Sequence, residues 1–207
     1  MRPLFDGGWG VRALLAVLSL AALVVAIALA VSIGEMAIPL ATTAQTLANR
    51  LFGAGFAVSP IQEGVIWDYR LSRALVAACC GAALALSGTI LQALLRNPLA
   101  EPYVLGISAG ASTGAVAVMI AGIGGGALSL SGGAFIGAVL AFLLVSLLAA
   151  GVGGGIDRVI LAGVAGSQLF NALTSTIVTT SANAEQARGV MFWLLGSLGG
   201  VRWPDVQ

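Results

Sequence analysis

The sequence predicts an all-α integral membrane protein, a polytopic bundle of about five transmembrane helices. Hydrophobic residues make up 59% of the 207-residue chain and charged residues only 8%, whereas about a quarter of a soluble domain is charged. Only 6% of the residues are aromatic, and 29 are glycine. The apolar residues are therefore mainly Ala, Leu, Val and Gly, which is typical of helices that pack closely in lipid.

A transmembrane helix needs about 20 mostly apolar residues, and five runs between charged residues meet this requirement. We expect them at residues 11–33, 74–95, 103–121, 132–152 and 159–181 of a single membrane domain that covers residues 1–207. The long connection 34–73 carries several charges, and its part 39–51 is a candidate interfacial helix.

The first run has a second interpretation. Arg2 and Arg12 precede it, and Ala28-Leu29-Ala30 imitates a signal-peptidase site. However, the run is longer than the roughly 7 to 15 residues of a signal-peptide core. Four further runs follow it, so we expect a retained helix.

The composition argues against several classes of function. His, the commonest general base and metal ligand, is absent. The only cysteines, Cys79 and Cys80, are adjacent in an apolar run, where we interpret them as packing residues. We therefore expect no catalytic site, no cofactor and no metal. A net charge of +1 gives no reason to expect nucleic acid as a partner.

Small residues recur at every fourth position in the third and fourth runs, at Gly106, Gly110 and Gly114 and at Gly133, Gly137 and Ala141. Such rows let two helix backbones approach closely in a membrane. We therefore expect these small residues to pack the spans into a compact helical unit.

The fifth run carries a polar stripe along one side of the expected helix, formed by Gln168, Asn171, Ser175 and Thr179. A polar stripe in lipid is costly unless it faces protein or water. The stripe could form hydrogen bonds between helices or line a solute pathway, and its periodicity does not choose between these.

Charge does not determine the orientation, because arginines are divided evenly between the two sides when the N-terminus is placed inside. The four inner ones are Arg2, Arg12, Arg96 and Arg158, and the four outer ones are Arg50, Arg70, Arg73 and Arg188. Two interruptions, 96–102 with two prolines and 151–158 with a glycine run, could be plain connectors.

Several short segments occur together in this order: RLSR at 70–73, GAALALSG at 81–88, NPLAEP at 97–102, LGIS at 105–108, LAGV at 161–164 and MFWLLGSL at 191–198. Together they resemble the FecCD family of permeases, the membrane subunits of ATP-binding-cassette importers for ferric siderophores, haem and cobalamin. The resemblance covers most of the chain from Arg70 onward.

The resemblance implies a permease subunit of such an importer, for an iron-siderophore or a related metal chelate such as haem or cobalamin. It implies a homodimer with roughly ten spans per subunit and the pathway at the dimer interface. A periplasmic substrate-binding protein would deliver the chelate, and separate cytoplasmic ATPase subunits would hydrolyse ATP. The protein would lie in the bacterial inner membrane, with its N-terminus in the cytoplasm.

The resemblance also implies roles for particular residues. Arg70 and Arg73 would receive acidic residues of the binding protein. The fifth span would line the pathway, which favours solute contact for the polar stripe, and the turns at its cytoplasmic exit would form a gate. The gate residues would be Asn97, Leu99, Gly155 and Ile156. Residues 185–198 would form a short periplasmic helix.

Two departures from the family pattern stand out. The sequence ends at Gln207, where a sixth span should begin, so we expect a fragment, a truncated frame or one piece of a split permease, lacking the part that grips the ATPase. The alternative function is therefore a truncated, non-transporting membrane scaffold or assembly partner. Ser72 stands where the family usually has Pro.

Overall fold

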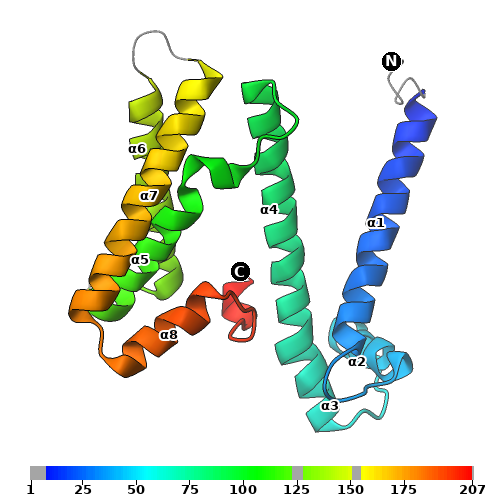
Figure 1. Ribbon diagram of the computed structural model, residues 1–207. Coiled ribbons are helices and arrows are strands. Elements are labelled where there is room, and N and C mark those ends of the chain that lie inside the picture. Colours follow the sequence, from blue (N-terminus) through cyan, green and yellow to red (C-terminus); the bar gives the residue numbers. More distant parts are fainter. Residues whose placement is uncertain (1–7, 123–127, 151–154, 207) are drawn as a thin grey trace. The chain divides into compact units, whose positions relative to one another are not determined.

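The computed structural model describes residues 8–122, 128–150 and 155–206 (Figure 1). These residues form helices joined by short connections, and no strand occurs among them. They fall into two compact units, Met1–Ala82 with Leu198–Gln207, and Ala83–Ser197. The helix α4, Ser72–Leu95, runs from the first unit into the second.

The first unit begins with α1, Trp9–Ser32, which is exposed along most of its length and buried at Val31 and Ser32. It continues with α2, Leu40–Phe52, α3, Pro60–Gly64, the π-helix η1, Val65–Leu71, and the start of α4. The core of this unit lies at the C-terminal end of α1 and consists of Val31, Ile38, Ile66, Leu71 and Ala74. The short helix η3, Trp203–Asp205, contributes Trp203 to this core.

The second unit contains the end of α4, the 3₁₀-helix η2, Pro102–Leu105, and the helices α5, Ile107–Ala121, α6, Leu130–Ala149, α7, Ile156–Ser181, and α8, Ala184–Leu194. A capping box starts α8: Asn183 accepts a hydrogen bond from the Gln186 N–H, and the Gln186 side chain accepts one from the Asn183 N–H. This cap fixes where the chain turns after α7.

Four helical stretches are long and apolar enough to cross a membrane: Trp9–Ser32, Pro60–Leu95, Leu130–Ala149 and Ile156–Thr180. A fifth apolar helix, Ile107–Ile120, is shorter. The prediction of an all-α polytopic membrane fold is thus confirmed by the part of the chain that the structure describes.

The helix bounds differ from the expected runs in instructive places. The run 103–121 is divided, because Pro102 starts the 3₁₀-helix and Gly106 adopts a left-handed conformation with φ of 68°. The α-helix therefore begins only at Ile107. The run 159–181 gains a turn at its start, since α7 begins at Ile156. Residues 151 and 152 of the expected fourth run lie outside the described residues.

Glycines bring α5 and α6 into backbone contact. Gly110 and Gly114 of α5 lie against Gly133 and Gly137 of α6, and a Cβ atom added at Gly110, Gly114 or Gly137 would overlap a backbone carbonyl of the facing helix. A Cβ at Gly133 would lie 2.5 Å from a Val118 methyl carbon and 2.8 Å from the Gly114 carbonyl oxygen. The close approach therefore depends on the absence of side chains at these positions.

Candidate functional site

The polar stripe of α7 lies away from the faces that pack against its neighbours. The hydroxyl of Thr113 in α5 hydrogen-bonds the Phe170 carbonyl and the Thr174 hydroxyl, both at 2.8 Å. A Cβ atom added at Gly106 would lie 3.1 Å from the Ser167 hydroxyl, which shows how closely this second point of α7 approaches the start of α5. These contacts mark one packed side of α7.

The stripe residues Gln168, Asn171, Ser175 and Thr179 are all exposed. At about 100° per residue, they lie roughly a third of a turn around the helix from the packed side. Within the described residues, the side-chain amides of Gln168 and Asn171 make no hydrogen bond, and Thr179 Oγ1 donates only to carbonyls of its own helix, Ser175 at 2.8 Å and Thr176 at 3.2 Å. The packed neighbours of α7 therefore leave the amides of Gln168 and Asn171 without hydrogen-bond partners among the described residues.

The turn after α4 and the start of α7 meet at a small apolar cluster. Ala100 in the turn packs with Leu91 and Leu95 of α4, and Val159 in the first turn of α7 packs against them. The Asn97 side chain holds the turn by accepting a hydrogen bond of 2.9 Å from the Leu99 N–H. This brings the two segments that carry the expected gate residues to one end of the second unit.

Two of the expected gate residues have exposed side chains. Leu99 is 86% exposed and Ile156 is 41% exposed. Gly155 is the N-cap residue of α7 and has an extended backbone conformation. Asn97 thus shapes the turn that presents Leu99, while Gly155 and Ile156 begin the helix that carries the polar stripe.

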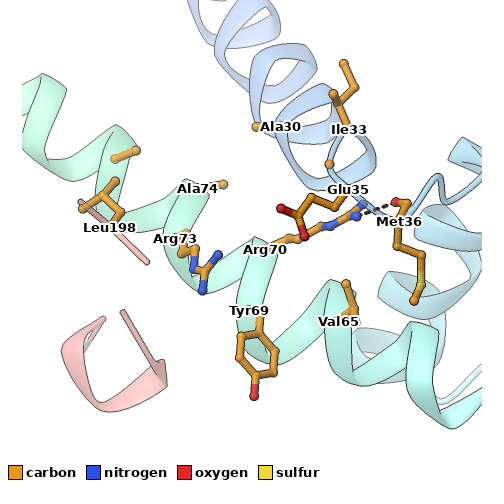
Figure 2. A pocket seen from close by; sticks show the side chains of 12 residues that line it. Ala30, Ile33, Glu35, Met36, Val65, Tyr69, Arg70, Arg73, Ala74 and Leu198 are labelled. Carbon is orange, nitrogen blue, oxygen red and sulfur yellow. Dashed lines mark hydrogen bonds between the residues drawn. The ribbon is translucent and has the colours of Figure 1, made fainter. Parts of the chain in front are cut away.

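Arg70 inserts its guanidinium among carbonyl groups at the C-terminal end of α1 (Figure 2). Nη1 donates to the carbonyls of Val31 and Ser32, at 3.1 and 2.9 Å, and Nη2 donates to that of Met36 at 2.5 Å. A Cβ atom on Gly34 would lie 2.7 Å from Nη2, so the glycine makes room for the arginine. The last carbonyls of a helix lack partners and attract positive charge, and Arg70 supplies both hydrogen bonds and charge.

Arg73 takes a different partner from Arg70, although the two arginines are only three positions apart. Its Nη2 donates to the Gly199 carbonyl, and its guanidinium carbon lies 5.7 Å from the centre of the Tyr69 ring. Its Nε is buried and has no hydrogen-bond partner among the described residues. Both arginines line a cavity of about 770 Å³, together with Glu35, Tyr69 and Leu198 (Figure 2).

Sequence reasoning missed Arg202, which lies beside this group. Its guanidinium carbon is 4.1 Å from the centre of the Tyr69 ring, within cation–π range. The next residue, Trp203, packs on Trp67 with ring centroids 4.9 Å apart. An arginine next to a tryptophan near the end of the sequence was the available signal, but only the folded chain shows that Tyr69 is its neighbour.

Apolar helices of spanning length and helix contacts built on glycine together define a multi-pass helical membrane protein. The sequence profile of the FecCD transport family matches residues 22–207. The chain belongs to this family, which confirms the resemblance read from its sequence segments.

Curated relatives agree with this assignment. Over 159 residues the chain is 36% identical to the cobalamin import system permease protein BtuC of Halobacterium salinarum, a match that covers 73% of this chain and 41% of the relative. It is 43% identical over 145 residues to the vitamin B12 import system permease protein BtuC of Klebsiella pneumoniae, covering 68% of this chain and 42% of the relative. The chain thus spans less than half the length of these relatives.

A solved structure shares the fold. It is the inward-facing conformation of an ABC transporter assigned to the metal-chelate type, and it matches with a TM-score of 0.72 and 29% identity. The match covers 94% of this chain and 56% of the solved chain.

Proposed function

We propose that this chain forms part of the translocation pathway in the permease of an ATP-binding-cassette importer that carries an iron-siderophore or a related metal chelate, such as haem or cobalamin. Membership of the FecCD transport family supports the class of protein. The names of the relatives from Halobacterium and Klebsiella support an import permease and favour a corrinoid among the chelates.

The polar stripe of α7 is the observation that carries the proposal. Gln168 and Asn171 are exposed, and their amides have no hydrogen-bond partner among the described residues. An unpaired amide in hydrocarbon costs several kcal/mol. The stripe therefore needs water, a solute or another protein surface, and a water-filled pathway between two permease copies provides the first two.

The segments that meet at the Leu91, Leu95 and Ala100 cluster supply a place for the gate. Leu99 is almost fully exposed at the tip of its turn, and Ile156 is exposed at the start of α7. Apolar side chains at a constriction can close a pore by excluding water. We assign this role to the turn that Asn97 shapes and to the Gly155 and Ile156 end of α7.

The remaining partners follow from the same proposal. A periplasmic substrate-binding protein delivers the chelate and docks at Arg70 and Arg73, separate cytoplasmic ATPase subunits drive the cycle, and a second permease copy completes the pathway. The protein lies in the bacterial inner membrane with its N-terminus in the cytoplasm.

The test is a steric block in the complete transporter. Asn171→Trp should abolish uptake of the transported chelate, whether this is radiolabelled cobalamin, haem or a ferric siderophore. Leu173→Trp is the matched control, because Leu173 is also exposed on α7 but lies on another side of the helix. Leu173→Trp should transport normally, and both variants should insert into the membrane.

Normal uptake by Asn171→Trp would refute the pathway role and would indicate that the stripe packs against another helix. Absence of uptake of every chelate by the unmodified complete transporter would refute the substrate class.

A further inference from the structure

The segment that joins α1 to α3 displays large apolar side chains on a rigid frame. Leu51 and Phe52 end α2 and are 62% and 83% exposed. Phe56 in the following loop and Ile61 in α3 are 49% and 68% exposed. We call these four residues the apolar tip.

The fully buried residues of α2 are polar, while Leu47 packs half-buried against the core of the first unit. Thr43 and Thr46 are its buried residues. The Ser32 hydroxyl at the end of α1 donates to the Thr43 hydroxyl at 3.2 Å, and Thr46 donates to the Thr42 carbonyl of its own helix at 2.9 Å. The large apolar residues at the end of α2 are therefore not needed for its packing on α1.

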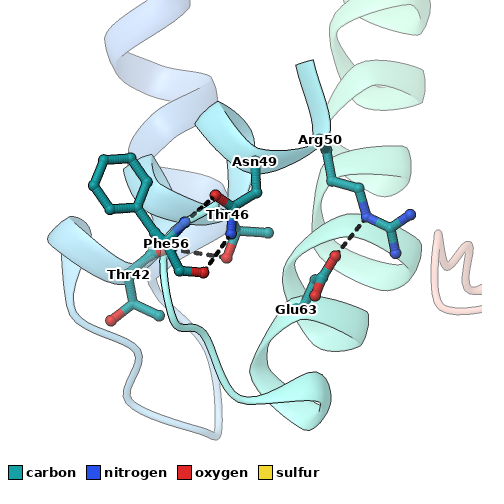
Figure 3. A network of polar contacts seen from close by, with 6 residues as sticks. All are labelled: Thr42, Thr46, Asn49, Arg50, Phe56 and Glu63. Carbon is teal, nitrogen blue, oxygen red and sulfur yellow. Dashed lines mark hydrogen bonds and ion pairs between the residues drawn. The ribbon is translucent and has the colours of Figure 1, made fainter. Parts of the chain in front are cut away.

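Hydrogen bonds hold the loop that carries the tip (Figure 3). The Asn49 amide donates to the Phe56 carbonyl at 2.8 Å, and its oxygen accepts from the Phe56 N–H at 2.7 Å. Gly53 ends α2 in a left-handed conformation with φ of 65°, and its N–H donates to the Asn49 carbonyl. The loop thus presents Phe52 and Phe56 in fixed positions.

An ion pair anchors the other side of the same loop. Arg50 Nε lies 2.6 Å from Glu63 Oε1 and ties the end of α2 to α3. Figure 3 shows the Phe56 ring on the side of the loop away from this pair. Charged and apolar groups are thereby separated within a few residues.

The position of the tip follows from α1. This helix has 24 residues, so at 1.5 Å per residue it is about 36 Å long, slightly more than the roughly 30 Å of a bilayer's hydrocarbon core. Its last residue, Ser32, therefore lies near the headgroups. The Ser32 to Thr43 hydrogen bond fixes α2 at this same level.

We infer that the apolar tip inserts into the boundary between lipid headgroups and acyl chains, in the leaflet at the C-terminal end of α1. The exposed apolar surface of α1 continues into this segment, at the depth where the headgroups meet the acyl chains. Segments with large apolar residues on one side and charged residues on the other are typical of the membrane interface. The tip then holds the C-terminal end of the first span at the membrane surface.

Spin labels in proteoliposomes test this inference. Single cysteines at Phe52 and at Phe56, in a background in which Cys79 and Cys80 are replaced, carry nitroxides whose collisions with oxygen and with a water-soluble nickel chelate are measured. The Phe56 side chain is free for labelling, because only its backbone bonds to Asn49. Leu20 in the middle of α1 gives the hydrocarbon reference, and the exposed Glu35 gives the aqueous reference.

We expect the oxygen-to-nickel collision ratio at Phe52 and Phe56 to exceed that at Glu35 several-fold, without any added protein. A ratio equal to that at Glu35 would overturn the inference. Dipolar broadening between labels would indicate a second copy, and protection that appears only with an added binding protein would indicate a protein partner. Either of these results would also overturn it.

A second set of variants guards against a local disturbance by the label. With the nitroxide at Ile61, Phe52→Leu with Phe56→Leu should leave the collision ratio unchanged, whereas Phe52→Ser with Phe56→Ser should lower it toward the aqueous value. Equal ratios in the leucine and serine variants would show that the tip does not hold the segment in lipid.

Discussion

The Ser32 carbonyl oxygen accepts a hydrogen bond of 2.9 Å from Nη1 of Arg70. The same guanidinium also bonds the carbonyls of Val31 and Met36, so one side chain from η1 closes the end of α1. No carboxylate lies within ion-pair distance of Arg70 among the described residues. Backbone carbonyls are therefore its hydrogen-bond partners among the described residues.

Arg70→Gln should destabilise the protein by about 1–3 kcal/mol, because charged hydrogen bonds to otherwise unpaired carbonyls are lost. Arg70→Lys should recover part of the loss, since an ammonium keeps the charge but cannot reach all three carbonyls. The measurement is the thermal unfolding midpoint of the purified protein in detergent. Arg50→Gln, which breaks the exposed pair with Glu63, should cost less than about 1 kcal/mol. An unchanged midpoint for Arg70→Gln would contradict the capping role.

Gly34→Ala should act through the same contact. Its Cβ would lie 2.7 Å from Nη2 and 2.9 Å from Cζ of Arg70, so the guanidinium must move away from the carbonyls. Gly200→Ala is the control, because nothing lies within 4 Å of a Cβ there. In a double-mutant cycle, Gly34→Ala should add little to Arg70→Gln. Fully additive losses would mean that the glycine has another function.

Gly137→Ala should weaken the contact between α5 and α6. The new methyl group would overlap the Gly110 carbonyl, a backbone group that no rotamer change can move aside. Overpacking of this kind costs about 1–3 kcal/mol, measured as a lower unfolding midpoint. Gly88→Ala in α4 meets nothing within 4 Å and should be neutral or stabilising by up to about 1 kcal/mol. If both variants unfolded at the wild-type temperature, the helices would have room to separate.

Much of the architecture could be predicted because apolar runs of spanning length and glycines at every fourth position report directly on helices in lipid. The places where these helices are interrupted or change type could not be predicted. The 3₁₀-helix before α5 depends on Gly106 adopting a positive φ, and η1 depends on a π-helical hydrogen-bond pattern over Val65–Leu71 that has no periodic signature in the sequence.

The arginines show the same limit for the candidate site. Spacing of three predicts that Arg70 and Arg73 share a helical face, but their guanidinium groups diverge, one to the end of α1 and the other to Gly199. Long flexible side chains choose partners that come from distant parts of the chain, and Gly199 lies 126 residues away. Sequence spacing fixes where such a side chain starts, not where its charge ends.

Docking of the proposed binding protein should therefore depend on both arginines in different ways. Arg70→Glu with Arg73→Glu should weaken docking strongly, and the loss should shrink as salt screens the repulsion. The loss of affinity caused by Arg73→Glu should decrease at high salt. The loss caused by Arg70→Glu should persist in part, because this substitution also loosens the end of α1, which salt does not restore. Docking affinities of the complete permease in nanodiscs at two ionic strengths separate these contributions. Arg50→Glu is the control for a single charge reversal elsewhere in the first unit, and unchanged affinity in the double variant would remove the docking role.

The π-helix η1 gives the 36-residue helical stretch Pro60–Leu95 a point where its register can change. Seven residues form η1, and a π turn holds one residue more than an α turn. Deleting a single residue there would convert the segment toward ordinary α-helix and rotate α3 and the start of η1 by about 100° relative to α4. Trp67 would leave Trp203 while the membrane-spanning part of α4 kept its orientation. Single-residue insertions and deletions usually disrupt a transmembrane helix, but in η1 they could change which side of α3 faces its neighbours.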